Sequence, residues 1–94
     1  MMRVREMAIA FPNGARSYDE TSNRIRFLGY DGMFEIRFFV EIEVLMKKAS
    51  PNGSSERDYL SAFDDLRTRI LDVAKRIYNS SRKNLIVLKL EDFK

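Results

Sequence analysis

Residues 24–40 read RIRFLGYDGMFEIRFFV, and they carry the clearest structural signal in this chain. Hydrophobic side chains alternate with polar ones on both sides of Asp31-Gly32, as they do in half-buried strands. An Asp-Gly pair between two such runs is typical of a tight hairpin turn, because glycine tolerates a positive φ. We therefore predict an antiparallel hairpin that turns at Asp31-Gly32 and places Phe27 opposite Ile36.

This register assigns the side chains of the hairpin to two faces. One face is apolar and is expected to cover the core. The other face combines arginine with aromatic and aliphatic side chains, namely Arg24, Arg26, Leu28, Tyr30, Arg37 and Phe39. In the predicted register Arg26 lies opposite Arg37. Such a like-charge pair costs stability, and it is easier to understand if an anion binds between the two side chains.

The segments before and after the hairpin are less regular. Residues 7–11 alternate as a strand does and end at Pro12, whereas residues 15–23 are polar and aperiodic and are predicted to form a loop. Residues 41–48 fit a strand or a helix. A short helix is favoured, because acids at its start and lysines at its end suit the helix dipole.

Residues 55–81 repeat their apolar side chains at helical spacing and predict the longest element of the chain. Ser55 is a suitable N-cap, with Asp58 in the position of a capping box. Residues 84–90 read NLIVLKL, which is typical of a well-covered strand. We predict one α+β domain over residues 1–94 with the order β-β-β-α-α-β. It is a two-layer fold, whose four-stranded, mostly antiparallel sheet is covered on one face by a long helix and a short helix.

The composition excludes several kinds of chemistry. The 94 residues include no cysteine and no histidine, so disulfides, thiolate or histidine nucleophile systems and cysteine-based metal sites are excluded. No phosphate-binding glycine motif is present, and the carboxylates are explained as surface charge. We predict no enzyme activity, no catalytic residue, no cofactor and no metal. Without a signal peptide or an apolar run of membrane length, a cytoplasmic location is expected.

Several short motifs along the chain point to a known family. In order, they are Ile9-Ala10-Phe11-Pro12, Tyr18-Asp19, Arg26-Phe27-x-Gly29-Tyr30-Asp31-Gly32 and Asp92-Phe93. With these motifs at this length, the chain resembles the family called domain of unknown function 1488. The resemblance implies a bacterial source, a cytoplasmic location and a compact α+β fold, and it favours helix for residues 41–48. It implies no activity and no site residue.

The mixed hairpin face is the candidate site. The residues predicted to bind are Arg24, Arg26, Tyr30, Arg37 and Phe39. We predict a non-catalytic binding or regulatory module that forms a homodimer through this face, since Tyr, Phe and Arg are enriched at interfaces. The alternative partner is nucleic acid, because arginine and aromatic side chains on a sheet stack bases and neutralise phosphates. Scattered apolar residues on a small monomer explain the pattern equally well, and whether a small molecule binds is left unknown by the sequence.

Overall fold

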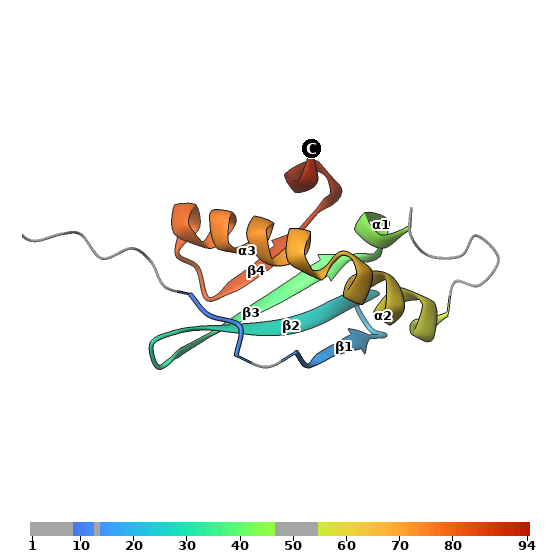
Figure 1. The fold of residues 1–94 in the computed structure, drawn as a ribbon, viewed down its shortest axis with the longest axis horizontal. Helices are drawn as coiled ribbons and strands as arrows, with labels where there is room; N and C mark the ends of the chain where they lie inside the picture. The colour runs from blue at the N-terminus through green and yellow to red at the C-terminus, as the bar shows by residue number, and fades with distance from the viewer. Residues whose placement is uncertain (1–8, 13, 47–54) are drawn as a thin grey trace, which may run out of the picture.

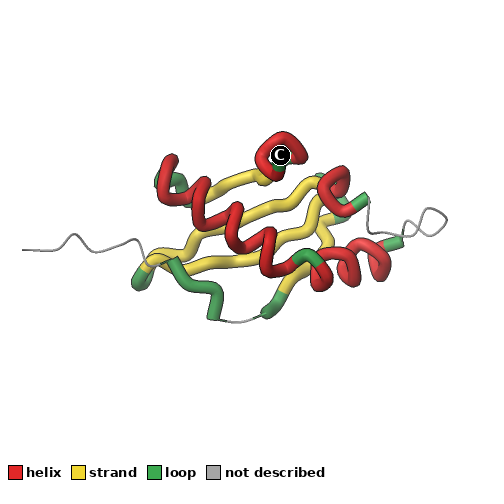
Figure 2. The backbone as a smooth tube through the Cα atoms, turned by 45° about the horizontal axis from the view of Figure 1, so that its top comes forward, coloured by secondary structure: helices red, strands yellow, loops and turns green. Residues whose placement is uncertain are grey.

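The computed structural model describes residues 9–12, 14–46 and 55–94 of the chain. The elements in chain order are β1 (Arg16–Asp19), β2 (Arg24–Asp31), β3 (Phe34–Glu41), α1 (Ile42–Leu45), α2 (Glu56–Asp65), α3 (Arg67–Ser81), β4 (Leu85–Leu88) and the 3₁₀ helix η1 (Leu90–Phe93). The strands form one sheet in the order β1-β2-β3-β4, in which only β3 and β4 are parallel. The helices lie over one face of this sheet (Figures 1 and 2). The predicted α+β class is confirmed.

The hairpin is confirmed, but its predicted turn and register are wrong. Asp31 pairs with Phe34 and Phe27 pairs with Phe38, so the two turn residues are Gly32 and Met33. Gly32 has a φ of +65°, whereas the φ of Met33 lies outside the left-handed region. Positive φ at the first turn position alone is the pattern of a type II′ turn, which also places glycine there. The shift of two residues leaves every side chain on its predicted face.

The first strand lies later in the chain than predicted. β1 falls within residues 15–23, which were predicted to be a loop. Of the predicted strand at 7–11, residues 7 and 8 lie outside the described residues. Ala10 exchanges two backbone hydrogen bonds of 2.8 Å with Tyr30, so it extends the same sheet edge as an isolated bridge. Ala10 and β1 therefore both pair with the outer edge of β2.

The helices follow the sequence closely, with one difference. The short helix is confirmed at α1, and Lys47 and Lys48 lie outside the described residues. α2 begins with the predicted capping box, in which Ser55 and Asp58 each accept a hydrogen bond from the other's backbone N–H. The predicted single long helix is divided at Leu66, whose φ and ψ are −101° and 10°. The two halves therefore cover different strands.

The core lies between the sheet and the helices. Phe27 and Phe38 stack with their ring centroids 5.1 Å apart, and Phe63 of α2 packs on the Phe27 ring. Gly29 leaves room above β2 for Phe11, because a Cβ atom at Gly29 would lie 2.7 Å from the Phe11 ring. No charged or polar residue among the described ones is buried. The last predicted strand forms as β4 at the β3 edge, where its inward side chains join this core.

Candidate interaction face of the sheet

The face of the sheet opposite the helices is the candidate site, and we call it the open face. Its side chains follow from the alternation along each strand and from the register between strands. They are Ser17 and Asp19 from β1; Arg24, Arg26, Leu28 and Tyr30 from β2; Glu35, Arg37, Phe39 and Glu41 from β3; and Leu85 and Val87 from β4. All of them are half-buried or exposed. The five residues predicted to bind all lie on this face.

The corrected register changes which of these residues are neighbours. Arg26 lies opposite Phe39, and Arg37 lies opposite Leu28. The predicted like-charge pair of Arg26 and Arg37 is therefore wrong, and the argument that it calls for a bound anion no longer holds. The hairpin turns one residue later than predicted, which shifts the strand pairing by two residues and places both Arg26 and Arg37 opposite an apolar partner.

Arg24 is held by two interactions at one end of the open face. Its guanidinium lies 3.6 Å from the carboxylate of Glu41, its partner across the strands. The same guanidinium lies 5.9 Å from the centroid of the Phe39 ring, within the range of a cation–π contact. Both groups are partly exposed, so the ion pair contributes little stability. Its main effect is to neutralise this end of the face.

A hollow of about 280 Å³ lies on the open face beside β1. Its lining residues are Ser17, Tyr18, Asp19, Arg26 and Phe39. The Ser22 hydroxyl donates a hydrogen bond of 2.7 Å to Asp19, and the Thr21 N–H donates another of 3.2 Å. The Ser22 hydrogen bond is the main reason why the pKa of Asp19 is lowered from its usual value. Asp19 therefore stays ionised beside Arg26.

Asp31 has a structural role that sequence reasoning missed. The Tyr78 hydroxyl on α3 donates a 2.7 Å hydrogen bond to the Asp31 carboxylate at the end of β2. This hydrogen bond, together with burial, raises the pKa of Tyr78. It ties the hairpin to the helix layer. Nothing in the sequence indicated this hydrogen bond, because the two residues are 47 positions apart and Asp31 was already explained as a turn residue.

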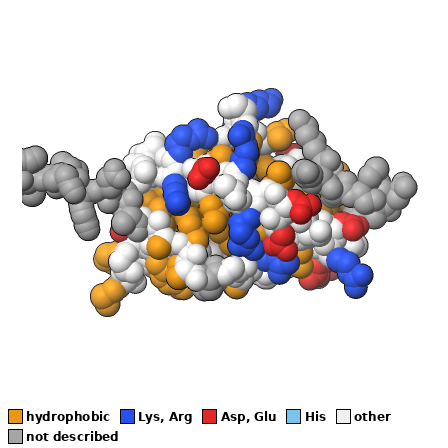
Figure 3. Space-filling view, in the orientation of Figure 1, with side chains coloured by type: hydrophobic (Ala, Val, Ile, Leu, Met, Phe, Trp, Pro, Cys, Tyr) orange, Lys and Arg blue, Asp and Glu red, His pale blue; other side chains and the backbone are white. Residues whose placement is uncertain are grey.

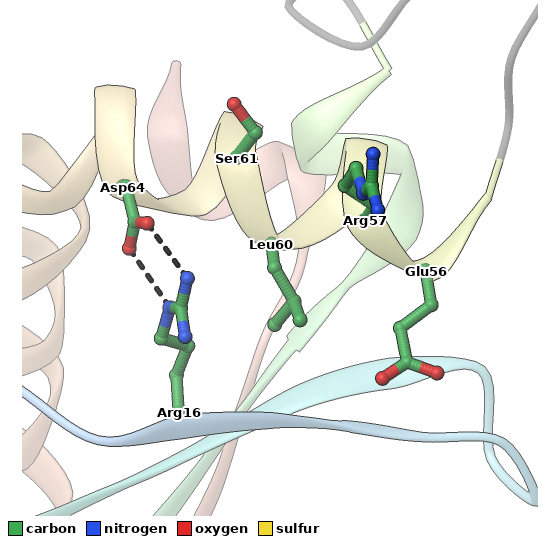
Figure 4. A pocket seen from close by; sticks show the side chains of 6 residues that line it. All are labelled: Arg16, Glu56, Arg57, Leu60, Ser61 and Asp64. Atoms are coloured by element: carbon green, nitrogen blue, oxygen red, sulfur yellow. Dashed lines mark hydrogen bonds and ion pairs between the residues drawn. The ribbon is translucent and has the colours of Figure 1, made fainter.

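A groove of about 520 Å³ runs between β1 and α2 on the helix side of the sheet (Figure 4). Its lining residues are Arg16, Glu56, Arg57, Leu60, Ser61 and Asp64. The Arg16 guanidinium donates two hydrogen bonds, of 2.9 and 2.7 Å, to Asp64, and Arg67 donates a third of 3.0 Å. Arg16 is the main cause of the lowered pKa of Asp64. Sequence analysis identified neither the groove nor this ion pair, whose members are 48 positions apart.

Charges of both signs are interspersed over the side on which the helices lie, and hydrophobic side chains gather toward the end where the hairpin turns (Figure 3). Met33 and Phe34 at that turn are 95% and 73% exposed. Within the part of the chain that the structure describes, no group of three or more acidic, cysteine or histidine side chains is placed to hold a metal ion. In the same residues, no helix has the length and apolar character needed to cross a membrane.

The fold and this face define a small α+β protein with an open four-stranded sheet, of which one face is covered by helices and the other is exposed and mixed in charge. The family described as protein of unknown function (DUF1488) matches residues 9–88, so the chain belongs to that family. No curated protein and no solved structure matches the chain. The resemblance drawn from the sequence motifs is thereby confirmed.

Proposed function

We propose that the protein is a non-catalytic binding module that self-associates through its open face. The supporting observation is that the cross-strand pairs of this face combine unlike groups. Arg24 lies opposite Glu41, and Arg26 lies opposite the aromatic ring of Phe39. Each strand of the hairpin thus carries side chains that attract the side chains of the other strand.

This pattern makes the face complementary to itself. A two-fold axis parallel to the strands, between β2 and β3, places β2 of one copy over β3 of the other. Arg24 then meets Glu41 of the second copy, and Arg26 meets its Phe39. Leu28 follows next along β2 and meets Arg37 of the second copy, and Val87 lies beside Phe39, so apolar groups lie next to the charged contacts of this interface.

The size of the face sets the strength to expect. Two strands of eight residues and two of four cover roughly 400 Å², so a dimer would bury about 800 Å² in total. That is below the usual size of specific, stable interfaces and corresponds to a weak, reversible association. A dimer that forms over tens to hundreds of micromolar fits this area.

Nucleic acid is the less favoured partner. Arg24, Arg26 and Arg37 are matched in number by Asp19, Glu35 and Glu41 on the same face. A face without net charge gives little of the electrostatic attraction that phosphate binding requires, whereas mixed charge around apolar groups suits a protein partner. Under the same proposal, the protein is bacterial and cytoplasmic, as the family resemblance implies.

Analytical ultracentrifugation of Leu28→Arg tests the proposal. Arginine at this position faces Arg37 both within one chain and across the dimer, so we expect at least a tenfold weaker dimer. The double variant Leu28→Arg with Arg37→Glu restores opposite charges and should recover association. Met33→Arg adds the same charge at the hairpin turn, outside the open face, and should leave association unchanged.

Two results would contradict the proposal. One is a monomeric mass up to about 500 μM, a concentration at which a dimer of the expected strength would be substantially populated. The other is an equal effect of Leu28→Arg and Met33→Arg. Fluorescence anisotropy with single-stranded DNA and RNA tests nucleic acid as the alternative partner. Binding that weakens steeply with salt would favour that alternative.

A further inference from the structure

The outer edge of β1 carries backbone groups that point away from the sheet. Tyr30 directs both of its backbone groups toward the β1 side, where they bond to Ala10. Backbone groups of successive strand residues point to opposite edges, so the backbone groups of Arg26 also face β1, where Ser17 is their partner. The alternation then directs the N–H and C=O groups of Arg16 and Tyr18 outward. No backbone partner for these two residues lies among the described ones.

α2 runs alongside this edge. Arg16 binds Asp64 near the end of α2, and the ring of Tyr18 lies 5.6 Å from that of Tyr59 near its start. β1 and α2 are therefore antiparallel neighbours. The groove described above lies between them, with Leu60 pointing into it midway along α2 (Figure 4). A free strand edge beside a helix-lined groove is the arrangement in which peptides bind by strand addition.

The two ends of the groove carry opposite charge. At one end Asp64 accepts hydrogen bonds from two arginines, Arg16 and Arg67, which leaves an excess of positive charge. At the other end Glu56 extends from α2 toward the sheet, whereas Arg57 stays level with the helix (Figure 4). An acidic side chain suits the first end and a basic one suits the second.

We propose that β1 and α2 form a binding site for an extended peptide of another protein, which adds a fifth strand antiparallel to β1. From its amino to its carboxyl end, the peptide carries a basic, an apolar and an acidic side chain at alternate positions. The basic residue lies at Glu56, the apolar residue under Leu60 and the acidic residue at the Arg16 and Arg67 end. This direction follows because an antiparallel peptide runs from Tyr18 toward Arg16.

The dimensions of the groove agree with this peptide. Residues 56 and 64 are separated by about 12 Å along the axis of α2. The first and last of three alternate residues in a strand are about 13 Å apart. The three side chains of the peptide therefore reach the two charged ends and the apolar centre at once.

The test uses the full chain and the peptide Ser-Lys-Thr-Leu-Thr-Glu-Ser, followed by NMR and amide hydrogen exchange. We expect exchange at Arg16 and Tyr18 to slow at least tenfold on binding. Exchange at Ser17 should be slow with or without the peptide, because its N–H faces β2. A peptide with the lysine and glutamate exchanged should bind several-fold more weakly, since each exposed ion pair contributes about two- to fivefold.

Glu56→Lys tests the charge assignment. It should weaken binding of the first peptide by about two- to fivefold and strengthen binding of the exchanged peptide by a similar factor. Asp72→Lys makes a comparable change in charge on the exposed side of α3, and the binding of both peptides should stay unaltered. The Leu28→Arg variant should keep peptide binding, so failure of self-association and failure of this proposal are distinguishable.

Three outcomes would overturn the proposal. In the first, no change occurs at the β1 amides with millimolar peptide. In the second, both peptides bind equally, which would refute the placement of the basic residue at Glu56 and of the acidic residue at the Arg16 and Arg67 end. In the third, exchange at Arg16 and Tyr18 slows with rising protein concentration and no peptide, which would show that a second copy occupies the edge.

Discussion

Gly29→Ala tests how tightly the segment before β1 packs on the sheet. The added Cβ atom would lie 2.7 Å from the Phe11 ring, 3.1 Å from the Phe38 ring and 3.2 Å from the end of Ile9. Phe38 is fully buried, so this ring has little room to move. Overpacking of this kind costs about 1–3 kcal/mol, whereas alanine in a strand regains about 0.5–1 kcal/mol over glycine. We expect the free energy of unfolding to fall by about 1–2 kcal/mol.

Urea denaturation followed by far-UV circular dichroism measures this change, with an unchanged m-value as evidence that both states keep their compactness. Gly14→Ala is the matched control. Its Cβ would lie 3.7 Å from the Arg67 guanidinium, an ordinary contact, so we expect a change within about 0.5 kcal/mol. Combining Gly29→Ala with Phe11→Leu should cost less than the two changes made separately. Equal effects of Gly29→Ala and Gly14→Ala would refute the packing of Phe11 over Gly29.

Three further changes test other contacts. Tyr78→Phe should lower the free energy of unfolding by about 1 kcal/mol, because Asp31 loses its donor. The raised pKa of Tyr78 means that this contribution is complete below pH 10 and is lost as the pH rises through the folded-state pKa, so wild type and variant should converge at alkaline pH. Ser55→Ala should cost about 1 kcal/mol in urea denaturation through loss of the N-cap. Asp64 has a lowered pKa, so its contribution is present above pH 3.8 and is lost as the pH falls through the folded-state pKa. Asp64→Asn should therefore flatten the acid limb of thermal denaturation curves, and an unchanged limb would argue against the Arg16 ion pair.

The hairpin shows what alternation can and cannot predict. The period of two places Ile25, Phe27 and Phe38 on the buried face, and this assignment is confirmed. It does not distinguish a turn at Asp31-Gly32 from one at Gly32-Met33, because the two registers differ by two residues and keep the same faces. Both turns also satisfy the glycine requirement. The tertiary structure selects the second turn, in which Val40 pairs with Ile25 in the core and Asp31 reaches Tyr78.

β1 could not be predicted, because its residues carry too little local signal. The four residues of β1 contain one large apolar group, the ring of Tyr18, so no alternation of apolar and polar side chains is visible. The strand is held instead by contacts with α2, through the Arg16 ion pair and the packing of Tyr18 on Tyr59. These partners lie about 40 to 50 positions away in the chain, a distance over which no local pattern carries information.

The same distinction applies to the candidate site and to the helices. Membership of the open face follows from alternation alone, so the five residues selected from the sequence all lie on this face. Their cross-strand partners depend on register, which the tertiary structure sets. The helical period of residues 55–81 predicted the helical layer, but it gave no sign of the break at Leu66. α2 packs on β1 and β2, whereas α3 packs on β4. Because a sheet twists, one straight helix cannot follow both edges, and the chain bends between them.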